Sequence, residues 1–244
     1  MKISAYILIA ALTFSGFLVV FAPASLVWST VQGDVTKAVP DLSVIKMGGS
    51  IWHGKSEIQF RQFPLSKITW EISPLKLLRG AESISITADG HGHSLDIEAL
   101  ITPSEGQVEL LEGEFGSSYI NSISEPYGLT FSGDLIIDKV SFVASKDEIK
   151  DASGTVHWSG GRVIVAGKDQ PLDLPPLDGK LFFEKQLLTF DVTFEQASLL
   201  RISLNKQGWA HIAIKGRFFD IANLPRPDGT SPDETILLLE EKIL

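Results

Sequence analysis

The chain has 244 residues, a formal net charge of −9 at pH 7, a pI near 5.0 and no cysteine. The acidic balance, without a cluster of Lys and Arg, excludes a nucleic-acid-binding surface, because contacts with backbone phosphates need clustered basic side chains. The lack of cysteine excludes disulfide bonds, thiolate metal sites and a cysteine nucleophile.

The first predicted element is a membrane-spanning helix. Residues 4–33 carry no charged side chain, and a helix over residues 5–28 would be roughly 35 Å long, enough to cross the hydrocarbon core of a bilayer. We therefore expect residues 1–4 in the cytoplasm, residues 5–28 as a transmembrane anchor and the rest of the chain exported. A cleaved signal peptide is the alternative, because Ala22-Pro23-Ala24 has the small residues of a cleavage site.

Alternation of apolar and polar residues dominates the chain after this segment. In residues 67–73, for example, Ile68, Trp70 and Ile72 occupy one face and polar residues the other. The same alternation occurs in residues 83–88, 95–101, 188–194, 201–205 and 211–215. Such a pattern is typical of strands with one buried and one solvent-exposed face, as in antiparallel sheets. We therefore predict an all-β domain over residues 29–223, built as a mostly antiparallel elongated sheet or sandwich.

Helix signals are few and short. Residues 74–78 could form a short helical turn, and residues 119–127 a loop or a turn of helix. Residues 224–234 are rich in proline and form a predicted linker, which ends in Ser231-Pro232-Asp233-Glu234, a typical start of a helix. We therefore predict that residues 224–244 are a linker and a short amphipathic helical tail, which either packs on the domain or docks a partner.

Two segments of the chain resemble one another. Residues 49–55 read GSIWHGK and residues 154–162 read GTVHWSGGR. Each starts with glycine and a hydroxyl residue, contains a tryptophan beside a histidine, and ends with glycine and a basic residue. This repetition predicts that the β-rich domain consists of two related halves.

Residues 49–56, GSIWHGKS, also match G-x-x-x-x-G-K-[ST], the signature of a phosphate-binding loop. Such a loop must begin a helix, so that backbone N–H groups at the helix N-terminus contact the phosphates. After Ser56, however, Ile58 and Phe60 alternate with polar residues, which predicts a strand. We therefore expect no nucleotide to bind here and interpret Lys55 as a strand residue.

No catalytic residue, cofactor site or metal site is predicted. His91 and His93 could share one side of a strand as metal ligands do, but no third ligand is evident and the neighbouring glycines favour a solvated turn. His53 and His157 each adjoin a tryptophan and are interpreted as half-buried residues at strand edges. We assign core or interface positions to Trp52, Trp70, Trp158 and Trp209, and solvated strand faces to Glu57, Glu71, Asp96 and Glu98.

Several short motifs, taken in order, resemble type II secretion system protein N. They are GSIWHGK (49–55), ITWE (68–71), SPLKLLRG (73–80), ADGHG (88–92), LTFSGDL (129–135), GTVHWSGG (154–161) and LDGKL (177–181). The resemblance covers nearly the whole chain except the tail after Pro227. It implies a single-pass protein of the bacterial inner membrane with a periplasmic β-rich domain, and it implies no catalytic residues.

The resemblance also implies a function. The chain would be a non-enzymatic component of the type II secretion apparatus, in assembly or scaffolding contact with the inner-membrane platform proteins or the outer-membrane secretin. An exposed sheet edge would suit this role, because its unpaired N–H and C=O groups accept a partner strand. One alternative is a periplasmic lipid-handling protein that bridges membranes through a β-groove, and another is an exported hydrolase with an unrecognised acid pair. The predicted groove is lined by Leu100, Leu111, Phe182 and Phe183.

Overall fold

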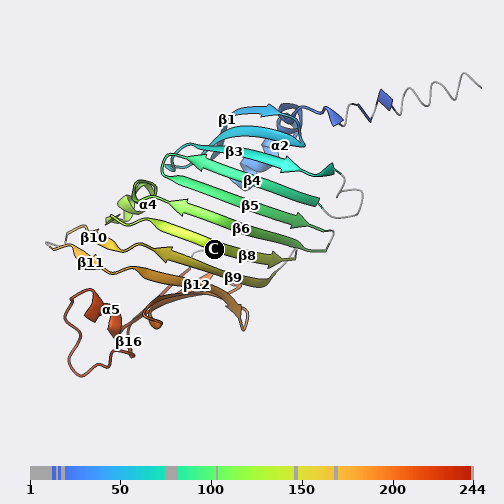
Figure 1. Ribbon diagram of the computed structural model, residues 1–244. Coiled ribbons are helices and arrows are strands. Elements are labelled where there is room, and N and C mark those ends of the chain that lie inside the picture. Colours follow the sequence, from blue (N-terminus) through green and yellow to red (C-terminus); the bar gives the residue numbers. More distant parts are fainter. Residues whose placement is uncertain are drawn as a thin grey trace, which may run out of the picture.

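The computed structural model describes residues 13–14, 16–17, 20–74, 82–102, 104–145, 148–167 and 170–242. Within these residues the fold is mostly β-structure, with one sheet of thirteen strands and one sheet of three (Figure 1). Every pair of neighbouring strands in the two sheets is antiparallel. The predicted all-β, mostly antiparallel fold is therefore confirmed.

The large sheet follows the chain, because nearly every strand pairs with the strands that precede and follow it in sequence. Antiparallel neighbours of this kind need only short turns between them. Within the described residues, β7, β10 and β11 leave this sheet to form the small one. The strands of the large sheet are β1 (Leu42–Gly49), β2 (His53–Phe60), β3 (Ser66–Ile72), β4 (Glu82–Gly90), β5 (His93–Ile101), β6 (Gly106–Phe115), β8 (Leu135–Ala144), β9 (Ile149–Trp158), β12 (Leu177–Glu184), β13 (Leu187–Phe194), β14 (Ala197–Leu204), β15 (Trp209–Lys215) and β16 (Thr235–Lys242).

The two faces of the large sheet differ in chemistry. Residues that pair directly across neighbouring strands point to the same face, so each row of paired residues belongs to one side. One row contains Ile86, Ile97, Leu110, Val140, Gly154, Leu181, Phe190, Ile202, Ile212 and Leu239. The row beside it contains Ser85, Glu98, Glu109, Ser141, Ser153, Phe182, Thr189, Ser203, His211 and Glu240. We call the face of the first, apolar row the inner face and the other the outer face.

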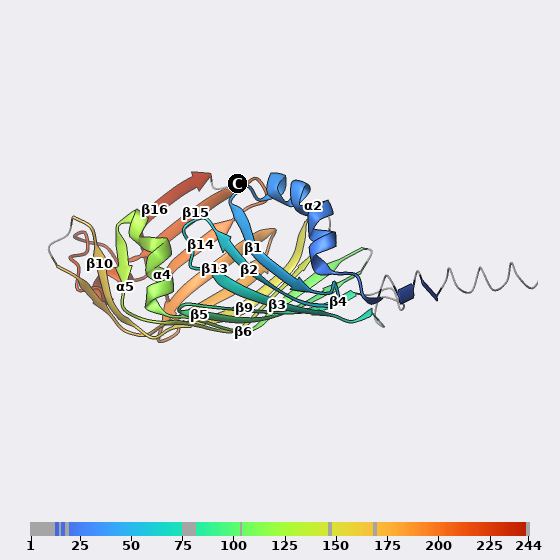
Figure 2. The ribbon, with the colours of Figure 1, turned by 90° about the horizontal axis from the view of Figure 1, so that it is seen from above.

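The large sheet is strongly curved. In the view from above, β13–β16 lie on the opposite side of the molecule from β5, β6 and β9, which gives the sheet the shape of a trough (Figure 2). The helix α2 (Ala24–Ala38) lies at one end of this trough, and two shorter helices lie at the other. The twist of neighbouring strands accumulates over so many strands, and a wide sheet therefore curls instead of staying flat.

The small sheet, in the order β11-β10-β7, covers the inner face at the end of the trough opposite α2. The chain leaves β9 for β10 through Gly160 and Gly161, whose φ angles of 80° and 135° favour glycine. The Asn121 side chain forms two hydrogen bonds, of 2.9 and 2.7 Å, with the backbone of Phe131 and thereby ties α4 to β7. We call these elements the cap: β7 (Leu129–Phe131), β10 (Gly161–Val165), β11 (Leu172–Leu174), α4 (Ser117–Ser124), the 3-10 helix η1 (Glu125–Tyr127) and α5 (Gly216–Ile221).

The inner face is apolar but incompletely covered. Among the described residues, Leu199 is the one large side chain that is almost completely buried, at 1% exposure. The inner-face residues Val108 and Leu239 remain 42% and 47% exposed. In a close-packed protein core such side chains are shielded from water. Part of the apolar inner face of the trough is therefore not covered by other protein segments.

The structure does not support the predicted transmembrane helix. Much of the predicted 5–28 anchor, and all of the 1–4 segment, lies outside the described residues. Within the part of the chain that is described, no helix is long and apolar enough to cross a membrane. The helix α2 instead runs past residue 28 to Ala38, into the predicted β-rich domain, and contacts β1. The predicted helical turn at residues 74–78 also lies almost entirely outside the described residues.

The prediction of a C-terminal helix is wrong, because residues 235–242 form strand β16. This strand pairs with β15 from Thr235 opposite Lys215 to Lys242 opposite Trp209. The residues expected to start a helix form a turn, in which the Ser231 N–H donates to the Glu234 carboxylate at 3.2 Å. The edge of β15 offers unpaired backbone groups to the tail, and this tertiary pairing outweighs the local helix propensity.

Candidate functional site

The segment that matches the phosphate-loop signature is the hairpin between β1 and β2. Strand β2 begins at His53, so the prediction of a strand in this segment is confirmed. A phosphate-binding loop would need a helix at this position. The Ser50 N–H donates to the His53 carbonyl at 2.8 Å, and the ring of Trp70 lies against Gly54 while its Nε1 donates to the Ile51 carbonyl at 3.1 Å. Backbone groups of the hairpin therefore form hydrogen bonds within the protein.

The two histidines proposed as possible metal ligands lie in different environments. His91 is exposed in the β4–β5 turn, whereas His93 is buried and its Nε2 lies 2.7 Å from the Ser66 hydroxyl. The expected solvated turn is therefore wrong for His93, because α4 places Tyr119 against its ring at a centroid distance of 4.4 Å. Burial raises the pKa of Tyr119. Of the residues that the structure describes, no three His, Cys, Asp or Glu side chains gather as metal ligands do.

The remaining polar candidates lie on the outer face. His53 pairs with Glu71 at 3.5 Å and is mostly exposed, while His157 pairs with Asp178 at 2.9 Å and is about half exposed. The half-buried environment expected of both therefore fits His157 only. Glu57 pairs with Lys46 at 3.2 Å, and Asp96 and Glu98 are exposed on β5. Of the tryptophans, Trp52, Trp70 and Trp158 are half-buried and Trp209 is 42% exposed.

A cavity of about 570 Å³ lies between the inner face and the cap, and we call it the apolar cavity. Its lining is almost wholly hydrocarbon, from both layers. The large sheet contributes residues such as Val156, Trp158 and Phe190, and the cap contributes residues such as Phe131, Val163 and Phe218. Asp178 lies at its margin, but its carboxylate pairs with His157 on the outer face. The apolar cavity can therefore hold an apolar ligand and offers a polar one no partner.

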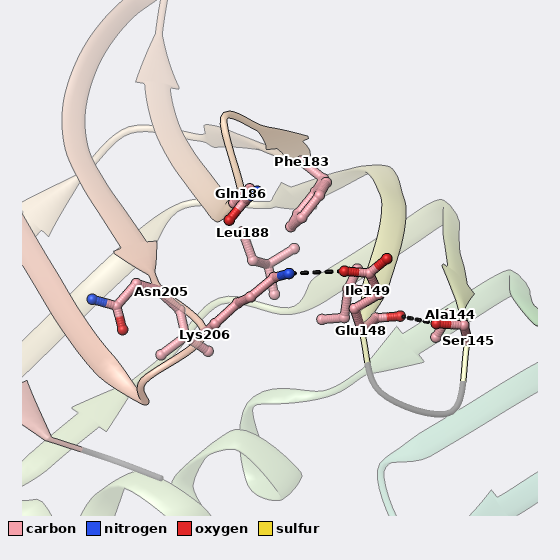
Figure 3. A pocket seen from close by; sticks show the side chains of 10 residues that line it. Ala144, Ser145, Glu148, Ile149, Phe183, Gln186, Leu188, Asn205 and Lys206 are labelled. Carbon is pink, nitrogen blue, oxygen red and sulfur yellow. Dashed lines mark hydrogen bonds and ion pairs between the residues drawn. The ribbon is translucent and has the colours of Figure 1, made fainter.

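A second pocket, of about 370 Å³, lies where β12–β14 approach the β8–β9 loop, and we call it the rim pocket (Figure 3). Phe183, Leu188 and Leu204 give it an apolar wall. Ala144 and Ile149 also line it, and its other residues are polar. Lys206 Nζ lies 2.8 Å from Glu148 Oε2 in an ion pair that joins the β14–β15 loop to the β8–β9 loop. The hydrogen bond from Lys206 lowers the pKa of the Glu148 carboxyl.

The two pockets are neighbours on one surface. Leu188 lines the rim pocket and Phe190 lines the apolar cavity, and these residues lie two apart on the inner face of β13. Residues two apart on a strand lie about 7 Å from each other on the same side. We call the apolar cavity and the rim pocket together the inner groove, which is apolar at the capped end and has both apolar and polar residues at the open end.

The residues predicted to line a groove are only partly on the inner face. Phe183 lines the rim pocket, as predicted. Phe182 and Leu100 belong to the outer face instead, because they pair with Ser153 and Gln107 in its rows. Leu111 is the extra residue of a bulge in β6. Most of the lining was missed, although the alternation in GRVIV (161–165) could have indicated the strand that carries Val163 and Val165.

The chain was compared with protein families, curated proteins and solved structures. A family model described as type II secretion system (T2SS), protein N matches residues 40–225. No curated protein and no solved structure matches the chain. The matched residues run from just before β1 to just after α5, so they contain the inner groove but not β16.

Proposed function

Because the chain belongs to the protein N family of the type II secretion system, we propose that it acts in the secretion apparatus as a non-enzymatic scaffold. In this proposal residues 5–28 anchor the chain in the bacterial inner membrane and the β-rich residues that follow lie in the periplasm. The uncharged N-terminal segment and its length support the anchor. The partners are the inner-membrane platform proteins or the outer-membrane secretin.

The observation that supports a scaffolding role is the open edge of the large sheet at β16. Within the described residues β16 ends the sheet, so one side of its backbone has no strand partner. Leu237, Leu238 and Leu239 on this strand are 40%, 61% and 47% exposed. Long apolar edge strands of this kind readily accept another strand, and β-strand addition is a common way to bind an extended partner segment. The opposite edge, at β1, is less open because α2 contacts it.

A site-specific cross-linking experiment tests this role. A photoreactive amino acid placed at Leu238, on the exposed outer face of β16, should cross-link to a platform protein or to the secretin when the full chain is expressed at its native level. Thr155 is an exposed outer-face residue in the middle of the same sheet and provides the matched control, which should give no such product. Equal yields from both positions, or no product with either class of partner from Leu238, would contradict docking at this edge.

A further inference from the structure

The size of the apolar cavity indicates a ligand site. An apolar void of about 150 Å³ is already large enough to take up a small hydrocarbon. The apolar cavity has a volume of about 570 Å³. That volume lies within the range of about 300–1,000 Å³ typical of small-molecule sites. The apolar cavity is open on one side, so it is a groove and not an enclosed void, and it is large enough for a ligand.

The chemistry of the lining limits what this ligand can be. Val156, Val192 and Leu200 from the large sheet, with Val163, Leu172 and Phe218 from the cap, present hydrocarbon from both layers. A charged or hydrogen-bonding group placed among them would lose its water without gaining a partner, which is costly. The part of the ligand that enters the apolar cavity must therefore be hydrocarbon.

The arrangement of the groove adds a second requirement. Among the described residues that line the groove, polar side chains gather at the rim pocket, where Gln186, Asn205 and the Lys206–Glu148 pair lie near apolar Leu188. An amphiphile can therefore place its hydrocarbon under the cap and its polar group at the rim, next to water. The cap belongs to the same chain and already covers the apolar cavity, so a folded partner or a second copy of this chain cannot pack against that part of the inner face.

We propose that the inner groove binds one acyl chain of a lipid, with the chain end under the cap and the polar end at the rim pocket. The curved sheet supplies the apolar wall, and the incomplete coverage of its inner face leaves the space that the acyl chain fills. This binding activity is independent of the docking proposed for the β16 edge, which lies outside the groove and is tested separately.

Native mass spectrometry of the full chain, released from a mild detergent, tests the proposal directly. We expect a one-to-one complex whose added mass, after extraction, is that of a fatty acid or of a phospholipid, and these two sources are distinguished by mass. The purified chain should also bind a fluorescent sixteen-carbon fatty acid. A chain that carries only detergent and does not bind the fluorescent fatty acid would overturn the proposal.

A matched pair of variants locates the site. Val156 and Thr155 are neighbours on β9 that point to the inner and outer face respectively. Val156→Trp fills the apolar cavity and should weaken fatty-acid binding at least tenfold, whereas Thr155→Trp should leave it unchanged. Leu172→Trp, which fills the cavity from the cap, provides the same test if Val156→Trp does not fold. Folded cavity-filling variants that bind the fatty acid as well as the unmodified chain would contradict the assignment.

Discussion

At the scale of single residues, two hairpin turns place residues other than glycine in the left-handed region. Lys185 and Gln186 between β12 and β13 have φ angles of 52° and 65°, and Glu195 and Gln196 between β13 and β14 have 49° and 67°. Two-residue hairpin loops of this kind match the twist of the sheet, but they normally contain asparagine or glycine. Because a side chain with a Cβ is disfavoured there by about 1–2 kcal/mol, each turn stores backbone strain.

Replacement of one of these residues by glycine should stabilise the protein. We expect Gln196→Gly to raise the free energy of unfolding by about 1 kcal/mol, since it removes the Cβ from a left-handed position. For a chain of this size that corresponds to an increase of about 2–4 °C in the unfolding midpoint, measurable by circular dichroism. Gln207→Gly, at a turn residue that does not itself have a positive φ, is the control and should lower the midpoint. A lower midpoint for Gln196→Gly would show that the turn is not strained.

The Glu148–Lys206 ion pair at the rim pocket should make a small, pH-dependent contribution to stability. The hydrogen bond from Lys206 holds the pKa of Glu148 below its ordinary value of 4.5. Since the folded state favours the charged carboxylate, the contribution is complete above the ordinary pKa and is lost as pH falls through the lowered pKa.

Thermal unfolding of Lys206→Met and of the unmodified chain checks this expectation. The variant should unfold at a slightly lower temperature at neutral pH, and the difference should disappear below the pKa of Glu148. Glu148→Gln should show the same loss at neutral pH, because it removes the other charge of the pair. A difference that stays constant into acid solution would exclude this ion pair as its cause.

At the scale of elements, β16 protects the edge of β15. The inner-face residues Ile212 and Ile214 of β15 pair with Leu239 and Leu237 of β16, so removal of the tail exposes both their side chains and a row of backbone groups. Exposed edges of this kind promote association between chains, and charged side chains on an edge oppose it. The open edge strand of the intact chain, β16, carries Glu240, Glu241 and Lys242, whereas β15 carries Lys215 as its one Asp, Glu, Lys or Arg residue. The tail is also outside the matched family region, which ends at residue 225.

Truncation after Glu234 should therefore lower the unfolding midpoint by several degrees and cause concentration-dependent self-association in analytical ultracentrifugation. Leu238→Ser is the matched control, since Leu238 lies on the outer face and its backbone pairing does not need the side chain. A surface substitution of this kind usually changes stability by no more than about 0.5 kcal/mol. A truncated chain that stays monomeric with an unchanged midpoint would contradict an edge-protecting role.

Sequence reasoning predicted the long strands and missed the short ones, and it was wrong about the tail, whose strand depends on pairing with a distant segment. Alternation over residues 67–73 and 188–194 predicted β3 and β13 with the correct apolar face. The strands β7 and β11 are too short to show a period. The tail was misinterpreted because its helix signals are local, whereas the pairing that makes it a strand is not.

At the scale of the whole molecule, the sequence predicts two-faced strands but not the shape that they build. The paired rows of the large sheet follow from alternation and short turns, whereas its curvature and the position of the cap depend on contacts between segments far apart in sequence. His93 illustrates the difference, because its burial comes from Tyr119 on α4. Most of the lining of the candidate site was missed for the same reason, because the apolar cavity exists only where the cap lies over the inner face. The relation between two halves of the domain, suggested by residues 49–55 and 154–162, stays a prediction.

The strand order of the large sheet has a consequence for how the chain folds. Most neighbours in space are neighbours in sequence, with longer steps where the chain passes through the cap between β6 and β8, between β9 and β12 and between β15 and β16. Such a topology has a low contact order for an all-β protein, and low contact order favours rapid folding. The large sheet can thus form hairpin by hairpin, because each new strand adds to an edge that has already formed. A hairpin gained or lost at either end would change the width of the trough without altering the path of the other strands.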